Sequence, residues 1–209
     1  MKTYHKIPTV YARDPQTNYK SLLIGQFATP ELDYLQHNTW VFTEKVDGTN
    51  IRVMFENGQI TFGGKTDKAL IQASLVNKLN EIFLPQIETF KELFNDAEVC
   101  MYGEGYGPKI QKGGGNYRKD QSFVLFDIRI GEWWLKREDI EDIAKKFGLD
   151  VVPIIGEGTL KEMVNKAKKG FNSIWGDFAA EGIVARPKTE LIARNGLRII
   201  TKIKFKDFI

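Results

Sequence analysis

A lysine placed two residues before an aspartate–glycine corner could do covalent chemistry. Lys45 lies in "TEKVDGTNIR", residues 43–52, where a strand-like run begins. A free lysine has a pKa of about 10.4, so very little of it is the neutral amine at pH 7. A nucleophilic lysine therefore needs burial or neighbouring cations to lose its proton. The alternative interpretation is a surface lysine at a strand end.

Two lysines near the end of the chain could supply those cations. In "RIITKIKFKDF", Lys202 and Lys204 are two residues apart, which places them on one face of a strand, roughly 7 Å from each other. Such a pair can clamp a phosphate, and it would also depress the pKa of a third lysine nearby. The alternative is a solvated, charged face of the strand.

Two acids and one aromatic residue are further candidates. Glu104 lies between glycines in "YGEGYG", where the backbone can approach a ligand closely. Glu181 precedes the apolar run "GIVAR", and a carboxylate there can bind a ribose hydroxyl or a hydrated divalent cation. Phe126, in "FVLFDIR", lies on the opposite strand face from Phe123 and Leu125. It is either a core residue or a platform for a base.

The sequence lacks the residues that several other kinds of site require. Cys100 is the one cysteine, so neither a disulfide framework nor a cysteine zinc site can form. His5 and His37 are isolated from each other. The glycine-rich stretch 105–115 does not fit the Walker pattern, and no dinucleotide-binding fingerprint precedes a helix.

Length and composition suit an ordinary folded enzyme. The 209 residues fit one domain, and an apolar fraction of 42% is enough for a core. The net charge of +3 permits a polyanionic partner without demanding one. No signal-peptide pattern or long apolar run is evident, so we expect a soluble monomer in the cytoplasm or another intracellular compartment, with no membrane partner.

The elements that must position these residues do not alternate regularly between strand and helix, which predicts an α+β fold with largely antiparallel pairing. Helical spacing covers 67–94, divided at Pro85, then 137–147 with Gly148 as its stop, and 160–168. The strand-like runs are 40–42, 50–55, 59–62, 98–102, 123–130, 183–186 and 197–205. Stretches 105–120 and 187–196 read as mobile loops.

In order along the chain, "KVDGTN", "GE", "FVLFDI", "EGIVAR" and "KIK" resemble the motifs of the covalent nucleotidyltransferase superfamily, which contains ATP-dependent ligases and capping enzymes. Glu44 directly before the lysine, Asn50 five residues after it, and Glu181 placed 21 residues before Lys202 resemble the nick-sealing, double-strand RNA ligases most. The resemblance implies a nucleotidyltransferase (ATP-grasp-like) fold with mainly antiparallel sheets and flanking helices. Because only five residues follow Lys204, we expect no OB domain here. It also implies that residues 1–209 form a single adenylyltransferase domain.

The resemblance implies a role for each motif. Lys45 would attack the α-phosphorus of ATP and form a lysyl-adenylate, while Lys202 and Lys204 would bind the α-phosphate. AMP would then pass to an RNA 5′-phosphate, and a 3′-hydroxyl would displace it. The substrate would be RNA with 5′-phosphate and 3′-hydroxyl ends in a nicked duplex, which the basic loop 105–120 could contact.

The remaining nucleotide-binding roles follow from the same resemblance. Glu44 would read the adenine edge, Phe126 would stack on the adenine, and Glu104 would hold the ribose. Glu181 would position a hydrated Mg²⁺ or Mn²⁺. Asn50 would contact the metal, through water, or the phosphate shell.

Two positions depart from the family pattern. Asp47 stands where these RNA ligases often have histidine, and Lys65 stands near the place of an arginine that meets the phosphate. A lysine supplies charge but no bidentate fork. The alternatives are a DNA ligase-like or capping-like transferase, and a non-catalytic nucleic-acid-binding module on the same fold.

Overall fold

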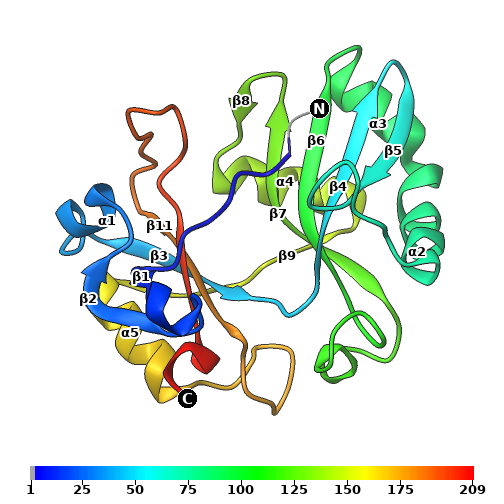
Figure 1. The fold of residues 1–209 in the computed structure, drawn as a ribbon. Helices are drawn as coiled ribbons and strands as arrows, with labels where there is room; N and C mark the ends of the chain where they lie inside the picture. Colours follow the sequence, from blue (N-terminus) through cyan, green and yellow to red (C-terminus); the bar gives the residue numbers. More distant parts are fainter. Residues whose placement is uncertain (1–2) are drawn as a thin grey trace. The chain divides into compact units, whose positions relative to one another are not determined.

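The structure is a computed structural model, and it describes residues 3–209 (Figure 1). The chain divides into two compact units. The first unit contains Asp47–Val152 together with residues 3 and 4, and the second contains His5–Val46 and Pro153–Ile209. Both combine helices with antiparallel sheets, which confirms the α+β prediction.

The first unit is built on one sheet, in which every pairing is antiparallel except that of β9 with β7. A tight turn at Asn57 and Gly58, both with positive φ, joins the strand at residues 49–56 to the strand at residues 59–63, as the Asn-Gly pair predicts. The strand order is β5 (Gln59–Gly63), β4 (Thr49–Glu56), β6 (Val99–Tyr106), β7 (Ser122–Ile130) and β8 (Trp133–Trp134), with β9 (Asp150–Val151) beside β7.

Helices supply the other half of the first unit's core. They are α2 (Ala73–Phe83), α3 (Ile87–Phe94) and α4 (Arg137–Phe147), with 3-10 turns η2 (Leu84–Gln86) and η3 (Gly114–Asn116). Pro85 separates α2 from α3, and α4 stops at Gly148, as predicted. Their apolar faces form one buried cluster with alternate residues of the strands, such as Ile51, Met101 and Leu125. The opposite side chains of these strands therefore face away from the helices.

The second unit contains a sheet in the order β10 (Ile154–Gly158), β3 (Trp40–Lys45), β11 (Gly182–Pro187) and β12 (Thr201–Lys204). A separate pair joins β1 (Tyr11–Arg13) to β2 (Leu22–Phe27). The helical segments are η1 (Pro15–Thr17), α1 (Pro30–Tyr34), α5 (Leu160–Lys169) and η4 (Phe205–Phe208). Trp40, Phe42, Ile183 and Ile203 form a buried cluster with the apolar face of α5.

Two expectations about boundaries need correction. Helix α2 begins at Ala73 rather than at residue 67, because Asp67 is held in a loop by Arg52, and Leu70 is fully exposed. Strand β12 begins at Thr201 rather than at 197, because Ile192 and Arg198 close a small hairpin. No described helix has the length and apolarity to cross a membrane.

The strands β1, β2, β8, β9 and β10 were not predicted, and β1, β8 and β9 are only two or three residues long. Glycines with positive φ, Gly25 in β2 and Gly156 in β10, interrupt their alternation of apolar and polar residues. Strand β10 nevertheless covers one edge of β3, the strand that carries Lys45.

Candidate active site

Strand register in the second unit brings Lys45 and Lys204 to either side of one glycine. Gly182 of β11 pairs with Lys45 on β3 and with Lys204 on β12. Cross-strand partners point to the same face of a sheet, so both lysines lie on one face, with no side chain between them. A Cβ atom at residue 182 would lie 2.2 Å from the Ile203 carbonyl oxygen, so β12 can approach β11 this closely only at a glycine.

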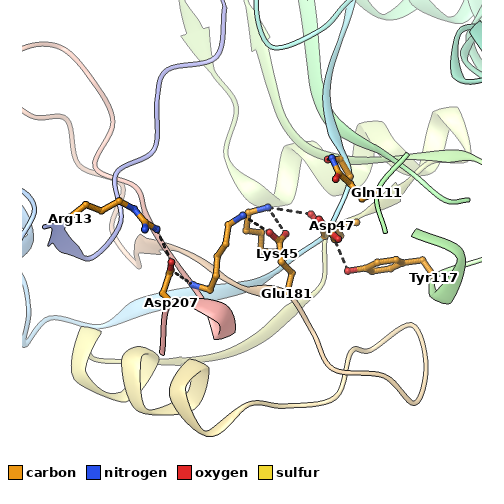
Figure 2. A network of polar contacts seen from close by, with 10 residues as sticks. Arg13, Lys45, Asp47, Gln111, Tyr117, Glu181 and Asp207 are labelled. Carbon is orange, nitrogen blue, oxygen red and sulfur yellow. Dashed lines mark hydrogen bonds and ion pairs between the residues drawn. The ribbon is translucent and has the colours of Figure 1, made fainter. Parts of the chain in front are cut away.

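Glu181 joins the two lysines directly. Its Oε2 atom lies 2.6 Å from Lys45 Nζ (Figure 2). Its Oε1 atom lies 2.5 Å from Lys204 Nζ. The three side chains are only 12–21% exposed. Two ammonium groups share one carboxylate, which leaves a net positive charge among these three groups in a partly desolvated place. Such a group of charges attracts an anion such as a phosphate.

Lys202 lies on the same face of β12 as Lys204. It pairs with Val184 of β11, which in turn pairs with Thr43 of β3. Its backbone N–H donates to Pro8 O and its carbonyl accepts from Val10 N, both at 3.1 Å. The N-terminal segment therefore pins the outer edge of the strand that carries both lysines. The strand register places Lys45, Lys202 and Lys204 on one face of one sheet, the grouping that the sequence predicts.

Glu44 occupies the opposite face of β3 from Lys45, the face that packs on the core. It is 1% exposed. Its Oε1 atom accepts a hydrogen bond from Ser173 Oγ at 2.6 Å, and its Oε2 atom accepts one from the Ile174 backbone N–H at 2.9 Å. Both oxygens thus hold the loop after α5. Sequence reasoning did not foresee this, because nothing in the spacing of Ser173 links it to β3.

In the first unit, Asn50 and Glu104 are direct neighbours. They are paired across β4 and β6, on the face turned away from the helices. The Asn50 Oδ1 atom is buried and accepts no hydrogen bond from any described residue. A Cβ atom at Gly48 would lie 2.3 Å from the Gly105 carbonyl oxygen and 2.7 Å from Glu104 Cγ, so the corner after Lys45 needs this glycine.

Phe126 lies at an irregularity of the sheet. The register between β6 and β7 shifts between Tyr102, which pairs with Asp127, and Gly103, which pairs with Leu125, so Phe126 is the extra residue of a bulge. Such bulges redirect side chains beside functional sites. The Phe126 ring is half-buried, and the Tyr4 ring meets it edge to face at 5.2 Å. The Tyr4 hydroxyl donates to Asp127 Oδ2 at 2.6 Å, so residue 4 is fastened beside the predicted adenine platform.

Lys65 is exposed, in the loop that follows β5. The buried Arg52 holds this loop: its Nε donates to Gly64 O at 2.9 Å, and its guanidinium pairs with Asp67 at 2.7 Å. The Arg52 guanidinium also holds the pKa of the Asp67 carboxyl below its usual range. Lys65 therefore stands at the surface of a tethered turn.

The glycine-rich loop 105–120, expected to be mobile, is fastened at several points. Tyr117 is buried, and its hydroxyl accepts a hydrogen bond from the Asp47 backbone N–H at 3.0 Å. The Gln111 Nε2 atom donates to Gly48 O at 3.1 Å. Of its basic residues, Arg118 pairs with Asp120 at 2.7 Å and lowers the pKa of that carboxyl. A glycine-rich sequence gives no signal for such anchors.

The donors present suit a hydrated divalent cation. Within residues 3–209, no group of three or more His, Cys, Asp or Glu side chains could hold a metal ion alone. In the second unit, the Glu181 carboxylate offers oxygen ligands. In the first unit, the buried Asn50 Oδ1 atom, which accepts no hydrogen bond from any described residue, offers another. Mg²⁺ prefers oxygen ligands and usually keeps several waters with one or two protein groups. Such donors fit Mg²⁺ or Mn²⁺.

Comparison with known proteins decides the family. The sequence model described as RNA ligase matches residues 38–204, which include every residue predicted for the site. The chain belongs to the RNA ligase family. This confirms the predicted membership of the covalent nucleotidyltransferases.

Solved RNA ligase structures from Naegleria gruberi share the fold. A variant with AMP and Mn is 18% identical, with a TM-score of 0.65, and the match covers 98% of this chain and 58% of that one. Another variant, with ATP and Mn, gives 18% and 0.66 over 96% and 56% of the two chains. The ligase with PPi gives 19% and 0.62 over 96% and 58%. This chain therefore spans less than two thirds of the length of these proteins.

Proposed function

We propose that this chain is an ATP-dependent RNA ligase that forms a covalent lysyl-AMP intermediate on Lys45. The observation that carries the proposal is the Glu181 carboxylate held between Lys45 and Lys204, on one face of one sheet. A lysine that only solubilises the surface needs no such placement. The nucleotides and Mn named with the similar Naegleria structures support ATP and a divalent cation, Mg²⁺ or Mn²⁺, as cofactors here.

In the first step, Lys45 Nζ attacks the α-phosphorus of ATP. A P–N bond forms, the bond from the α-phosphorus to the bridging oxygen breaks, and pyrophosphate leaves with the electron pair. Because an ammonium has no lone pair, Lys45 must first give up its proton to the surrounding water. Lys202 and Lys204 neutralise the non-bridging oxygens of the α-phosphate, which is how catalysts of phosphoryl transfer mainly act.

The other site residues would hold the rest of the nucleotide. Phe126 stacks on the adenine, Glu104 binds the ribose hydroxyls, and Lys65 adds charge near the phosphates. For Glu44 to read the adenine edge, its buried carboxylate must release Ser173 or the Ile174 N–H and turn away from the core.

Glu181 and Asn50 would hold the hydrated divalent cation, which supplies charge neutralisation at the phosphates when bound. A cation held by Glu181 would draw on the negative charge that the carboxylate now shares between Lys45 and Lys204, so the Lys45 amine would be freer to lose its proton.

The later steps act on RNA. An oxygen of the RNA 5′-phosphate attacks the phosphorus of lysyl-AMP, and the Lys45 amine leaves and regains a proton. The 3′-hydroxyl then attacks the activated 5′-phosphate, a phosphodiester forms, and AMP leaves. We propose a nicked duplex as the substrate, and a monomer whose residues 1–209 act together as one adenylyltransferase domain in an aqueous compartment.

The experiment is intact mass measurement after incubation with ATP and Mg²⁺. The expected result is a gain of one AMP that is lost in acid, because phosphoramidate bonds are acid-labile. Lys45→Arg keeps the charge but should abolish the gain, since a guanidinium is not deprotonated in proteins. An adduct that persists in Lys45→Arg would overturn the assignment of the nucleophile. Sealing of an RNA nick, compared with an all-DNA nick, tests the substrate.

A further inference from the structure

A short turn directly after β12 folds back on the strand that carries the lysines. In η4, the Asp207 carboxylate accepts a hydrogen bond from the Lys204 backbone N–H at 2.9 Å through Oδ2. Its Oδ1 atom accepts from the Arg13 guanidinium at 2.7 Å (Figure 2). The Asp207 side chain is only 4% exposed. A carboxylate this buried is costly to ionise without partners, and it has both a cation and a backbone donor.

The turn η4 also binds the backbone of Glu181, whose side chain contacts Lys204. The Phe205 backbone N–H donates to the Glu181 carbonyl oxygen at 3.0 Å. One turn therefore fixes the backbones of both Glu181 and Lys204, whose side chains meet at 2.5 Å. Any shift of η4 changes the approach of these two side chains.

Arg13 is itself held in place. Its guanidinium donates to the carbonyl oxygens of Tyr19 and Lys20, at 3.3 and 3.2 Å, in the turn that precedes β2. The guanidinium thus links the β1–β2 pair to Asp207, and Asp207 links it to Lys204. This chain of contacts lies within the second unit.

We infer that Asp207 and Arg13 are positioning residues for the phosphate-binding lysine: they set where Lys204 stands against Glu181. Both residues lie outside the stretch 38–204 that matches the family. The inference rests on the proposed function, because Lys204 is assigned there to the α-phosphate. A displacement of about 1 Å at a reacting group can cost about 100-fold in rate, so contacts this close to the strand matter for chemistry.

The test separates the rate of lysyl-AMP formation from the amount formed. At saturating ATP, the final amount of adduct counts the folded molecules, whereas the rate constant reports how well the phosphate is held. Asp207→Ala should lower the rate constant roughly 10- to 100-fold and leave the final amount unchanged. Arg13→Met leaves Asp207 as acceptor for Lys204 and should slow the step less.

An exchange of the two charges distinguishes positioning from folding. The double variant R13D/D207R can re-form the ion pair but offers the Lys204 N–H no carboxylate at residue 207. Its melting temperature should recover relative to Asp207→Ala, and its rate constant should stay low. If the exchanged pair does not fold, Asp207→Asn decides, because its amide oxygen can still accept from Lys204 and should retain more of the rate than alanine does.

The control is Glu157→Ala, which removes an exposed ion pair with Lys188 in the same unit and should change neither quantity. A wild-type rate constant in Asp207→Ala, or a loss of final amount alone, would overturn the inference while the ligase assignment stands. Failure of the wild-type protein to form any adduct would instead overturn the proposed function.

Discussion

Replacing Gly182 with alanine should push β12 away from β11 and separate Lys204 from Glu181. The added Cβ would lie 2.2 Å from the Ile203 carbonyl oxygen and 2.7 Å from Lys204 Cα, both of them backbone atoms. Ordinary contact begins at 3.4 Å, so β12 must retreat by about 1.2 Å, the difference between 3.4 and 2.2 Å. Backbone cannot rotate out of the way as a side chain can.

That retreat would break contacts on which the site depends. The Phe205 N–H to Glu181 O bond, now 3.0 Å, would exceed hydrogen-bonding distance, as would the 2.5 Å contact of Lys204 Nζ with Glu181. Overpacking of this kind lowers the free energy of unfolding by about 1–3 kcal/mol. For a protein of this size, that lowers the melting temperature by about 2–12 °C. Misplacing Lys204 should slow lysyl-AMP formation about 100-fold.

Thermal unfolding and quenched mixing with ATP measure the two effects. The matched control is Gly115→Ala, since a Cβ atom there meets nothing within 4 Å, and it should leave both values unchanged. If Gly182→Ala has the same melting temperature as the wild type and forms the adduct at the same rate, then the close approach of β11 and β12 does not set the position of Lys204.

Three further outcomes follow from the described contacts. Burial raises the pKa of the Cys100 thiol to about 11, from 9.0, so at pH 8 it should react with a disulfide reagent at least about 100-fold more slowly in the folded protein than in urea. Arg52→Met should speed proteolysis of the loop around Lys65 more than a change at exposed Asp67 does, because Arg52 also holds Gly64. Thr159→Ala should destabilise α5 by about 1 kcal/mol in urea unfolding.

The Thr159 cap also has a pH dependence. Hydrogen bonds from the Thr159 backbone and hydroxyl hold the pKa of Glu162 below its usual value. The contribution of the ionised carboxylate is complete above its unfolded pKa of about 4.3, and it is lost as pH falls through the lower folded pKa. The difference between wild type and Thr159→Ala should therefore be smaller at pH 3 than at pH 7.

Each of these outcomes has a result that contradicts it. Equal thiol reactivity in folded and unfolded protein would place Cys100 at the surface. Unchanged proteolysis in Arg52→Met would mean that the loop is held by other contacts. A pH-independent effect of Thr159→Ala would exclude Glu162 from the cap.

Much of the fold was readable from local patterns. The spacing of Leu75, Leu79 and Phe83 marks α2, Gly148 ends α4, and Asn57-Gly58 turns β4 into β5. These signals are local, because helix periodicity, capping and turn conformation depend on residues a few positions apart. Strands β2 and β10 were not predicted, because glycines interrupt their alternation of apolar and polar residues.

The sequence by itself determined which residue types the site uses: an early lysine, two late lysines two residues apart, and acids beside glycines. Only the tertiary structure decided their partners. That Glu181 touches both lysines depends on the register of three strands through Gly182, and the Asp207 carboxylate that holds Lys204 is paired with Arg13, 194 residues away along the chain. Contacts between such distant residues are set by the packing of whole elements, and no local pattern of amino acids encodes them.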